Sequence, residues 1–158
     1  MIVLARIDDR LIHGQVVEGW LRVIQAHRIV VVSDHVSQDS FQAGLMRLAV
    51  PPEVDFVALS VADAAKVLAS SQWKDERVVL LLPGLREARL LAEAGWIPPS
   101  LNLGGLHDAP GRVSYTPSLS LGVEDKEDLR FLIARKIPID TRALPSDDNV
   151  PVEKYLGS

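Results

Sequence analysis

A short segment near the start of the chain contains two acids, two arginines and a histidine. The segment reads Arg6-Ile7-Asp8-Asp9-Arg10-Leu11-Ile12-His13-Gly14-Gln15. An imidazole with an ordinary pKa near 6.5 is largely neutral at neutral pH, so it can attack phosphorus and later release the phosphoryl group. An arginine can neutralise the phosphoryl oxygens without a metal. We therefore interpret His13 as a phosphoryl acceptor and donor, and Arg10 as the cation that binds the phosphate.

The elements on either side of this segment are those that would position a phosphate. Residues 2–5 are apolar and predict a first β-strand, and the next apolar residues recur at the spacing of one helix face: Val16, Val17, Trp20, Leu21 and Ile24. In open α/β sheets, ligands bind at the carboxyl ends of the strands. A helix amino terminus there offers free N–H groups and the positive end of its dipole. The sequence thus predicts a phosphate site in the turn between strand and helix.

Supporting roles fall to the remaining polar residues of the segment. Neighbouring side chains at a strand end point in opposite directions, so Asp8 and Asp9 are not expected to converge as an acid–base pair. We assign Asp8 to the orientation of the histidine or the arginine. Gly14 would let the backbone approach the phosphate closely. Gln15 would either donate a hydrogen bond to the phosphate or simply lie on the first helical turn.

Each of these features also has an ordinary structural interpretation. His13 could cap the helix, and Arg10 could form a surface ion pair of little energetic weight with one of the acids. Gly104-Gly105 could cradle phosphate with backbone N–H groups, but a turn between closely passing strands is favoured. Pro83-Gly84 follows an expected strand at 77–82, and would face the histidine loop if that strand lies beside the first.

Composition limits the classes of protein to which the chain can belong. Its 158 residues suit one domain, and 47% of them are apolar, which argues against disorder. A net charge of −4 and a pI of about 5.5 argue against a nucleic-acid binder. The absence of cysteine excludes disulfides and thiol chemistry. No apolar run approaches the roughly 18 residues of a membrane span, and no signal peptide is visible. We expect a cytoplasmic protein without metal or cofactor.

Strand and helix patterns alternate along most of the chain. Further strands are expected at 28–34, 54–59, 77–82, 100–103, 112–115, 118–121 and 137–143, and helices at about 39–50, 61–70, 85–94 and 123–136. This alternation predicts a single α/β domain with a mostly parallel β-sheet and helices on both faces. The domain is expected to span residues 1–145, and residues 146–158 to form a polar C-terminal tail.

The histidine segment resembles that of one known family. It matches the pattern R-[IV]-D-x-R-L-[IL]-H-G-Q of the IIB component of the mannose/sorbose family of the phosphoenolpyruvate-dependent sugar phosphotransferase system. The similarity continues through Trp20, Val32-Ser33-Asp34, Pro51-Pro52 and Asn102-Leu103-Gly104-Gly105, and covers about nine-tenths of the chain. The ten-residue segment is the specific part of this match.

The resemblance implies a function, partners and roles for matching residues. It implies a protein-Nπ-phosphohistidine–sugar phosphotransferase in which His13 accepts a phosphoryl group, at Nδ1, from a phosphohistidine of a IIA protein. The group would then pass to a sugar held by a membrane IIC/IID permease. Arg10 would bind the phosphate, and Asp8 would orient His13 or Arg10. The family fold is a single α/β domain with a largely parallel sheet.

Two other functions remain open at this point. The same histidine chemistry could serve a regulatory phosphorelay in an incomplete phosphotransferase system, without sugar transport. A ligand-binding α/β domain that is never phosphorylated is also conceivable. Against that last interpretation, no G-x-G-x-x-G follows the first strand and no Walker lysine motif is present.

Overall fold

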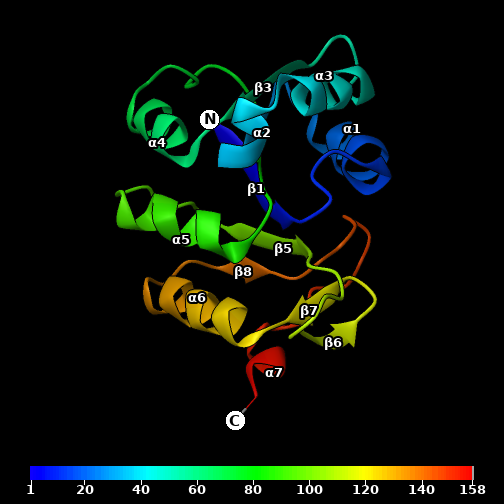
Figure 1. Cartoon of the computed structure of the whole chain (residues 1–158), viewed down its shortest axis with the longest axis vertical. Helices are drawn as coiled ribbons and strands as arrows, with labels where there is room; N and C mark the ends of the chain where they lie inside the picture. The colour runs from blue at the N-terminus through cyan, green and yellow to red at the C-terminus, as the bar shows by residue number, and fades with distance from the viewer. Residues whose placement is uncertain (158) are drawn as a thin grey trace.

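A parallel six-stranded β-sheet forms the centre of the computed structural model, which describes residues 1–157 (Figure 1). The strand order is β3-β2-β4-β1-β5-β8, and every neighbouring pair is parallel. The sheet strands are β1 Ile2–Asp8, β2 Arg28–Val32, β3 Asp55–Leu59, β4 Val78–Leu82, β5 Leu101–Gly105 and β8 Ile139–Asp140. A separate antiparallel hairpin consists of β6 Val113–Thr116 and β7 Leu119–Leu121. The predicted α/β class and mostly parallel sheet are confirmed.

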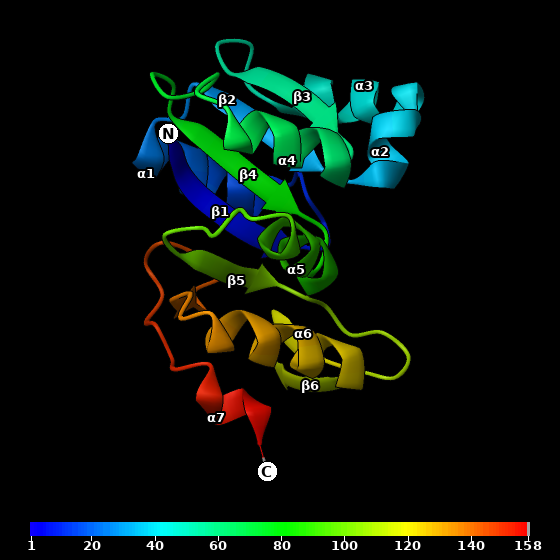
Figure 2. The same ribbon diagram turned by 90° about the vertical axis from the view of Figure 1, so that its left-hand side faces the viewer.

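Helices cover both faces of the sheet, as expected, and each face has its own apolar core (Figures 1 and 2). On one face lie the π-helix η1 Gln15–Trp20, α1 Leu21–Ile24, α2 Asp34–Gln38 and α3 Ser40–Ala49. On the other lie α4 Val61–Ala69, α5 Leu85–Glu93 and α6 Val123–Ala134. The central strands are buried on both sides, which explains their uninterrupted apolar runs, such as the five buried residues of β4.

β1 lies between β4 and β5, at the point where the chain connections diverge. The connection that follows β1 runs over one face of the sheet, through η1 and α1. The connections after β4 and β5 run over the opposite face, through α5 and α6. Open α/β sheets bind ligands at the carboxyl end of such a divergence. The predicted histidine turn therefore occupies the expected place, and the Pro83-Gly84 turn follows a strand adjacent to it.

Three expected elements differ in the structure. The predicted amphipathic α-helix begins as a π-helix over Gln15–Trp20 and becomes α-helical only at Leu21–Ile24. The strand expected at 100–103 extends as β5 to Gly105, so the two glycines belong to the strand and not to a turn. The strand expected at 137–143 is only Ile139–Asp140, because the chain beyond it leaves the sheet to bond to side chains near the histidine.

The segment after residue 145 packs on the same domain. It contains the short helix α7 Glu153–Leu156, and Val152 belongs to the core that α5 and α6 build.

On the opposite side of the molecule, α3 leaves Phe41, Leu45 and Leu48 exposed. No helix within residues 1–157 is long and apolar enough to cross a membrane.

Candidate functional site

The loop after β1 is held in an unusual backbone conformation. Leu11 has a φ of 55°, in the left-handed region that costs a non-glycine residue roughly 1–2 kcal/mol. Its backbone N–H donates to the carbonyl of Asp8 at 3.0 Å, and its side chain is buried in the core beneath η1. Backbone strain of this kind occurs at functional sites whose surroundings fix the loop. The buried Leu11 side chain thus anchors the turn that leads to His13.

His13 is held by Asp8 through one ring nitrogen only. Nε2 lies 2.7 Å from Asp8 Oδ2, and the side chain of His13 is 18% exposed while that of Asp8 is fully buried. Within residues 1–157, the one buried side-chain nitrogen or oxygen without a partner is Gln15 Oε1. Nδ1 of His13 also has no partner in this part of the chain, and it is not among the buried unpartnered atoms, so it contacts solvent. A carboxylate on Nε2 favours the tautomer with the proton there, which leaves the lone pair on the exposed Nδ1.

Asp8 is kept ionised by a buried arginine. Asp8 Oδ2 accepts from Arg6 Nη2 at 2.8 Å and Nε at 3.1 Å, and Oδ1 accepts from the backbone N–H of Arg10 at 3.0 Å. Burial alone would raise the pKa of Asp8, but the hydrogen bond with His13 and the charge of Arg6 outweigh it, and the pKa lies below its ordinary value. The Asp8 carboxylate is therefore charged in the folded protein at neutral pH.

Arg6 itself is buried among partners from distant parts of the chain. Its Nη1 donates to Asn102 Oδ1 at 2.8 Å and to the carbonyl of Ala143 at 2.9 Å, and Trp20 Nε1 donates to the same carbonyl at 2.9 Å. A Cβ atom at Gly104 would collide with the guanidinium. The glycine in β5 thus makes room for Arg6. A Cβ atom at the neighbouring Gly105 would lie 3.0 Å from the Asp8 carboxylate. Both glycines therefore belong to a strand that makes room for side chains of β1, and the favoured turn is incorrect.

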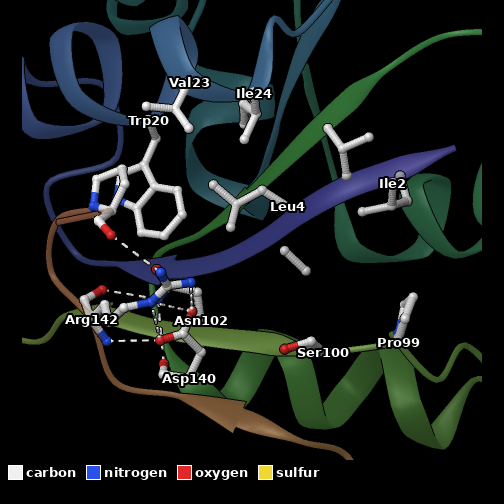
Figure 3. Close-up of a pocket in the computed structure, with 13 residues that line it drawn as sticks. Ile2, Leu4, Trp20, Val23, Ile24, Pro99, Ser100, Asn102, Asp140 and Arg142 are labelled. Atoms are coloured by element: carbon white, nitrogen blue, oxygen red, sulfur yellow. Dashed lines mark hydrogen bonds and ion pairs between the residues drawn. The ribbon is translucent and has the colours of Figure 1, made fainter. Parts of the chain in front are cut away.

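A cavity of about 440 Å³ lies between the start of β1, the helix that carries Trp20 and the segment around Asp140 (Figure 3). Its wall includes Asn102, which bonds to Arg6, and Trp20, whose ring centroid lies 5.7 Å from Arg6 Cζ. Asp140 and Arg142 also line it. The last two bind each other, with Arg142 Nη2 at 2.8 Å from Asp140 Oδ2. Asn102 links this wall to the site, because its Oδ1 accepts from Arg6 Nη1 at 2.8 Å and its Nδ2 donates to the Arg142 carbonyl at 2.9 Å.

The other residues predicted for the site have varied environments. Arg10 is exposed, and its side chain has no hydrogen bond or ion pair within residues 1–157; the alternative ion pair with an adjacent acid does not form. Gly14 has an ordinary helical φ of −54° and open space where a Cβ would be. Gln15 has a buried Oε1 without a partner. The structure therefore places one free cation, Arg10, on the loop that carries His13.

A second aspartate–histidine pair was not anticipated from the sequence. Asp9 Oδ1 lies 2.6 Å from His107 Nδ1, and Asp9 Oδ2 accepts from the His107 backbone N–H at 2.8 Å. Consecutive acids thus hold different histidines, as the alternation of side chains at a strand end implies. No local pattern indicates this contact, since 98 residues separate the partners. Arg6 was not predicted as a site residue either, although its position two residues before Asp8, on the same strand face, could have indicated the pair.

The fold and the site define an α/β protein with an open parallel sheet and a carboxylate-bound histidine after its first strand. The family model described as the PTS system sorbose subfamily IIB component matches residues 2–158. The chain belongs to this family of phosphotransferase-system IIB components, as its resemblance indicated.

Individual relatives support this assignment over nearly the whole chain. The fructose-specific EIIB component of Bacillus subtilis is 36% identical and covers 92% of this chain and 90% of its own length. The mannose-specific EIIAB component of Escherichia coli is 35% identical over 93% of this chain, which spans 46% of that protein. The crystal structure of the IIBSor domain of the sorbose permease from Klebsiella pneumoniae superposes with a TM-score of 0.91 at 34% identity, covering 98% of this chain and 94% of the other.

Proposed function

We propose that His13 accepts a phosphoryl group from a phosphohistidine of a IIA protein and passes it to a sugar bound by a membrane IIC/IID permease. The observation that carries this proposal is the geometry of the ring: Nε2 is 2.7 Å from the buried carboxylate of Asp8, whereas Nδ1 faces solvent. Nδ1 is then the nucleophile, and an exposed loop allows another protein to approach it. The mannose relative, whose name joins A and B components in one chain, supports a IIA partner.

Asp8 prepares the ring for both transfers. When phosphorus bonds to Nδ1, the proton on Nε2 remains and the ring becomes cationic, which the Asp8 carboxylate stabilises. The bond from phosphorus to a cationic ring breaks readily, so the same contact that favours acceptance also favours release. Arg6 acts behind Asp8 as a positioning residue, because it fixes the carboxylate and balances its charge in a buried environment.

The acceptor is a hexose-type sugar in this proposal. The relatives are named for sorbose, fructose and mannose, so several hexoses are candidates for a IIB chain of this sequence. The sugar itself would be bound by the membrane permease, and the chain would work at the cytoplasmic surface of that permease.

Labelled phosphoenolpyruvate tests the proposal directly. With the general phosphotransferase proteins and a candidate IIA protein, we expect one acid-labile, base-stable label per chain, on the peptide that contains His13. Nitrogen NMR of the labelled chain should locate phosphorus on Nδ1. Absence of label, with a IIA protein that becomes labelled itself, would contradict the proposal, and a label on Nε2 would contradict the assigned geometry.

Arg10 is proposed to bind the phosphoryl oxygens. Arg10→Ala is expected to slow transfer from IIA by about 10²-fold or more, because it removes a positive charge next to the developing negative charge. The folding stability should change little, since the side chain is exposed and has no partner within residues 1–157. Rapid-quench measurement of label transfer gives the rate. Lys66→Ala removes the same charge on α4 and serves as the control; equal rates for both variants would reject the role of Arg10.

A further inference from the structure

The pair formed by Asp9 and His107 mirrors the pair formed by Asp8 and His13. In the first pair the carboxylate holds Nδ1 of the histidine, at 2.6 Å, and in the second it holds Nε2. Nε2 of His107 has no partner within residues 1–157 and is not among the buried unpartnered atoms, so it contacts solvent. Because Nδ1 carries the proton toward Asp9, the exposed Nε2 carries a lone pair. His107 is therefore arranged as a base.

Its position is at the same edge of the sheet as His13. β1 and β5 are hydrogen-bonded neighbours, with Asp8 opposite Gly105, and the backbone N–H of Asp9 donates to the Gly105 carbonyl at 2.9 Å. The loops after both strands leave this carboxyl edge (Figures 1 and 2). His13 follows β1 and His107 follows β5, so the two histidines stand on the loops of neighbouring strands.

Further contacts hold the His107 loop in place. Arg112 Nη1 donates to the His107 carbonyl at 2.9 Å and lies 3.5 Å from Asp9 Oδ2, while its Nε donates to Asp125 Oδ2 at 3.1 Å. The charge of Asp9 is thus shared between the histidine ring and an arginine anchored on α6. Within residues 1–157, Nε2 is the one ring nitrogen of His107 that no hydrogen bond engages.

The two proposed transfers differ in their need for a base. Transfer from one histidine to another moves a phosphoryl group between nitrogens and releases no proton. Transfer to a sugar forms a bond between a hydroxyl oxygen and phosphorus, and the hydroxyl proton must leave. A positioned base contributes about 10²- to 10⁴-fold to such a step. Asp8 already holds Nε2 of His13, so a separate group has to accept this proton.

We propose that His107 Nε2 is the general base for transfer to the sugar, an inference that rests on the proposed function of His13. The sugar oxygen bonds to phosphorus as the bond between phosphorus and His13 Nδ1 breaks, and the electron pair of that bond returns to Nδ1. The hydroxyl proton moves to His107 Nε2, and Asp9 stabilises the resulting cation. The proton then passes to solvent, which restores the neutral histidine.

His107→Asn separates the two transfers. The amide of asparagine can donate to Asp9 as Nδ1 does, but it has no counterpart of Nε2. With purified IIA and membrane vesicles that contain the cognate IIC and IID proteins, labelled chain is mixed with mannose, fructose or sorbose. We expect transfer to the sugar to slow by about 10²-fold, whereas labelling by IIA proceeds. An equal loss in both transfers, or no loss in either, would overturn the proposal.

A rescue experiment distinguishes a base from a structural support. In His107→Ala, added imidazole should restore transfer to the sugar in proportion to its concentration, and should leave labelling by IIA unchanged. His35→Asn, which alters a histidine that is 78% exposed on α2, should match the wild type in both transfers. Failure of imidazole to restore transfer would overturn the role of His107. If wild-type chain is labelled but transfers to no sugar, the proposed function itself fails.

Discussion

His13→Ala is expected to accept no phosphoryl group while it keeps the wild-type fold. The substitution removes the ring whose exposed Nδ1 is proposed to accept the phosphoryl group, on the loop that also carries Arg10. Within residues 1–157 its side chain makes one hydrogen bond, to Asp8, and Asp8 keeps both contacts with Arg6 when that bond is lost. The free energy of unfolding should therefore fall by about 1.5–3 kcal/mol, the range for one hydrogen bond to a charged group. Label transfer from IIA and circular dichroism on heating measure the two quantities.

The remaining histidines supply the control for this variant. His27, His35 and His107 are still present in His13→Ala, so any label on it would show that another ring accepts the phosphoryl group. His35→Ala should be labelled at the wild-type rate, because its ring lies on α2 and is mostly exposed. Label on His13→Ala with an acid-labile, base-stable character would reject the assignment of His13.

Much of this site was predictable because local sequence determines it. A charged segment between an apolar strand and an apolar helical face places His13 and Arg10 on a carboxyl-edge turn by chain order alone. The order of the strands was not predictable, because parallel pairing joins segments far apart, such as β1 with β4 and β5. The fold class followed from the alternation of strand and helix patterns along the chain, which can be recognised without knowing which strands pair.

The residues that hold Arg6 and Asp9 in place could not be predicted either, because they are far away in the sequence. Arg6 is held by Asn102 and the Ala143 carbonyl, and Asp9 by His107, all through contacts about 100 residues away in sequence or further. The glycines of β5 were read as a turn because glycine usually marks one. In the structure they clear space for side chains of β1, which a one-dimensional pattern does not reveal.

Asp8→Asn is expected to damage both stability and transfer. Asp8 Oδ2 receives bonds from His13 and twice from Arg6, and Oδ1 receives the Arg10 backbone N–H. An amide has one acceptor oxygen, and it leaves the buried charge of Arg6 without a counter-charge. Removal of one partner from a buried ion pair costs about 3–5 kcal/mol. Denaturant unfolding should show a loss of this size, and transfer from IIA should slow because the ring loses its fixed tautomer.

The pH dependence of the stability that Asp8→Asn loses identifies the cause of that loss. The folded protein holds the pKa of Asp8 below its ordinary value, so Asp8 contributes stability above the ordinary pKa of about 3.9. That contribution disappears as pH falls through the lower pKa of the folded state. The stability difference between wild type and Asp8→Asn should therefore be full at neutral pH and shrink in acid. A difference that stays constant down to acid unfolding would mean that packing, and not the charge, accounts for the loss.

A double variant separates the stability role of Asp8 from its role in transfer. Arg6→Gln with Asp8→Asn removes both buried charges, and neutral replacements of a buried pair are often tolerated. The double variant should regain much of the stability lost in Asp8→Asn. It should still transfer slowly, because no carboxylate holds Nε2 of His13 or stabilises the phosphorylated ring. Recovery of the wild-type transfer rate would show that Asp8 acts on His13 only by keeping the loop folded.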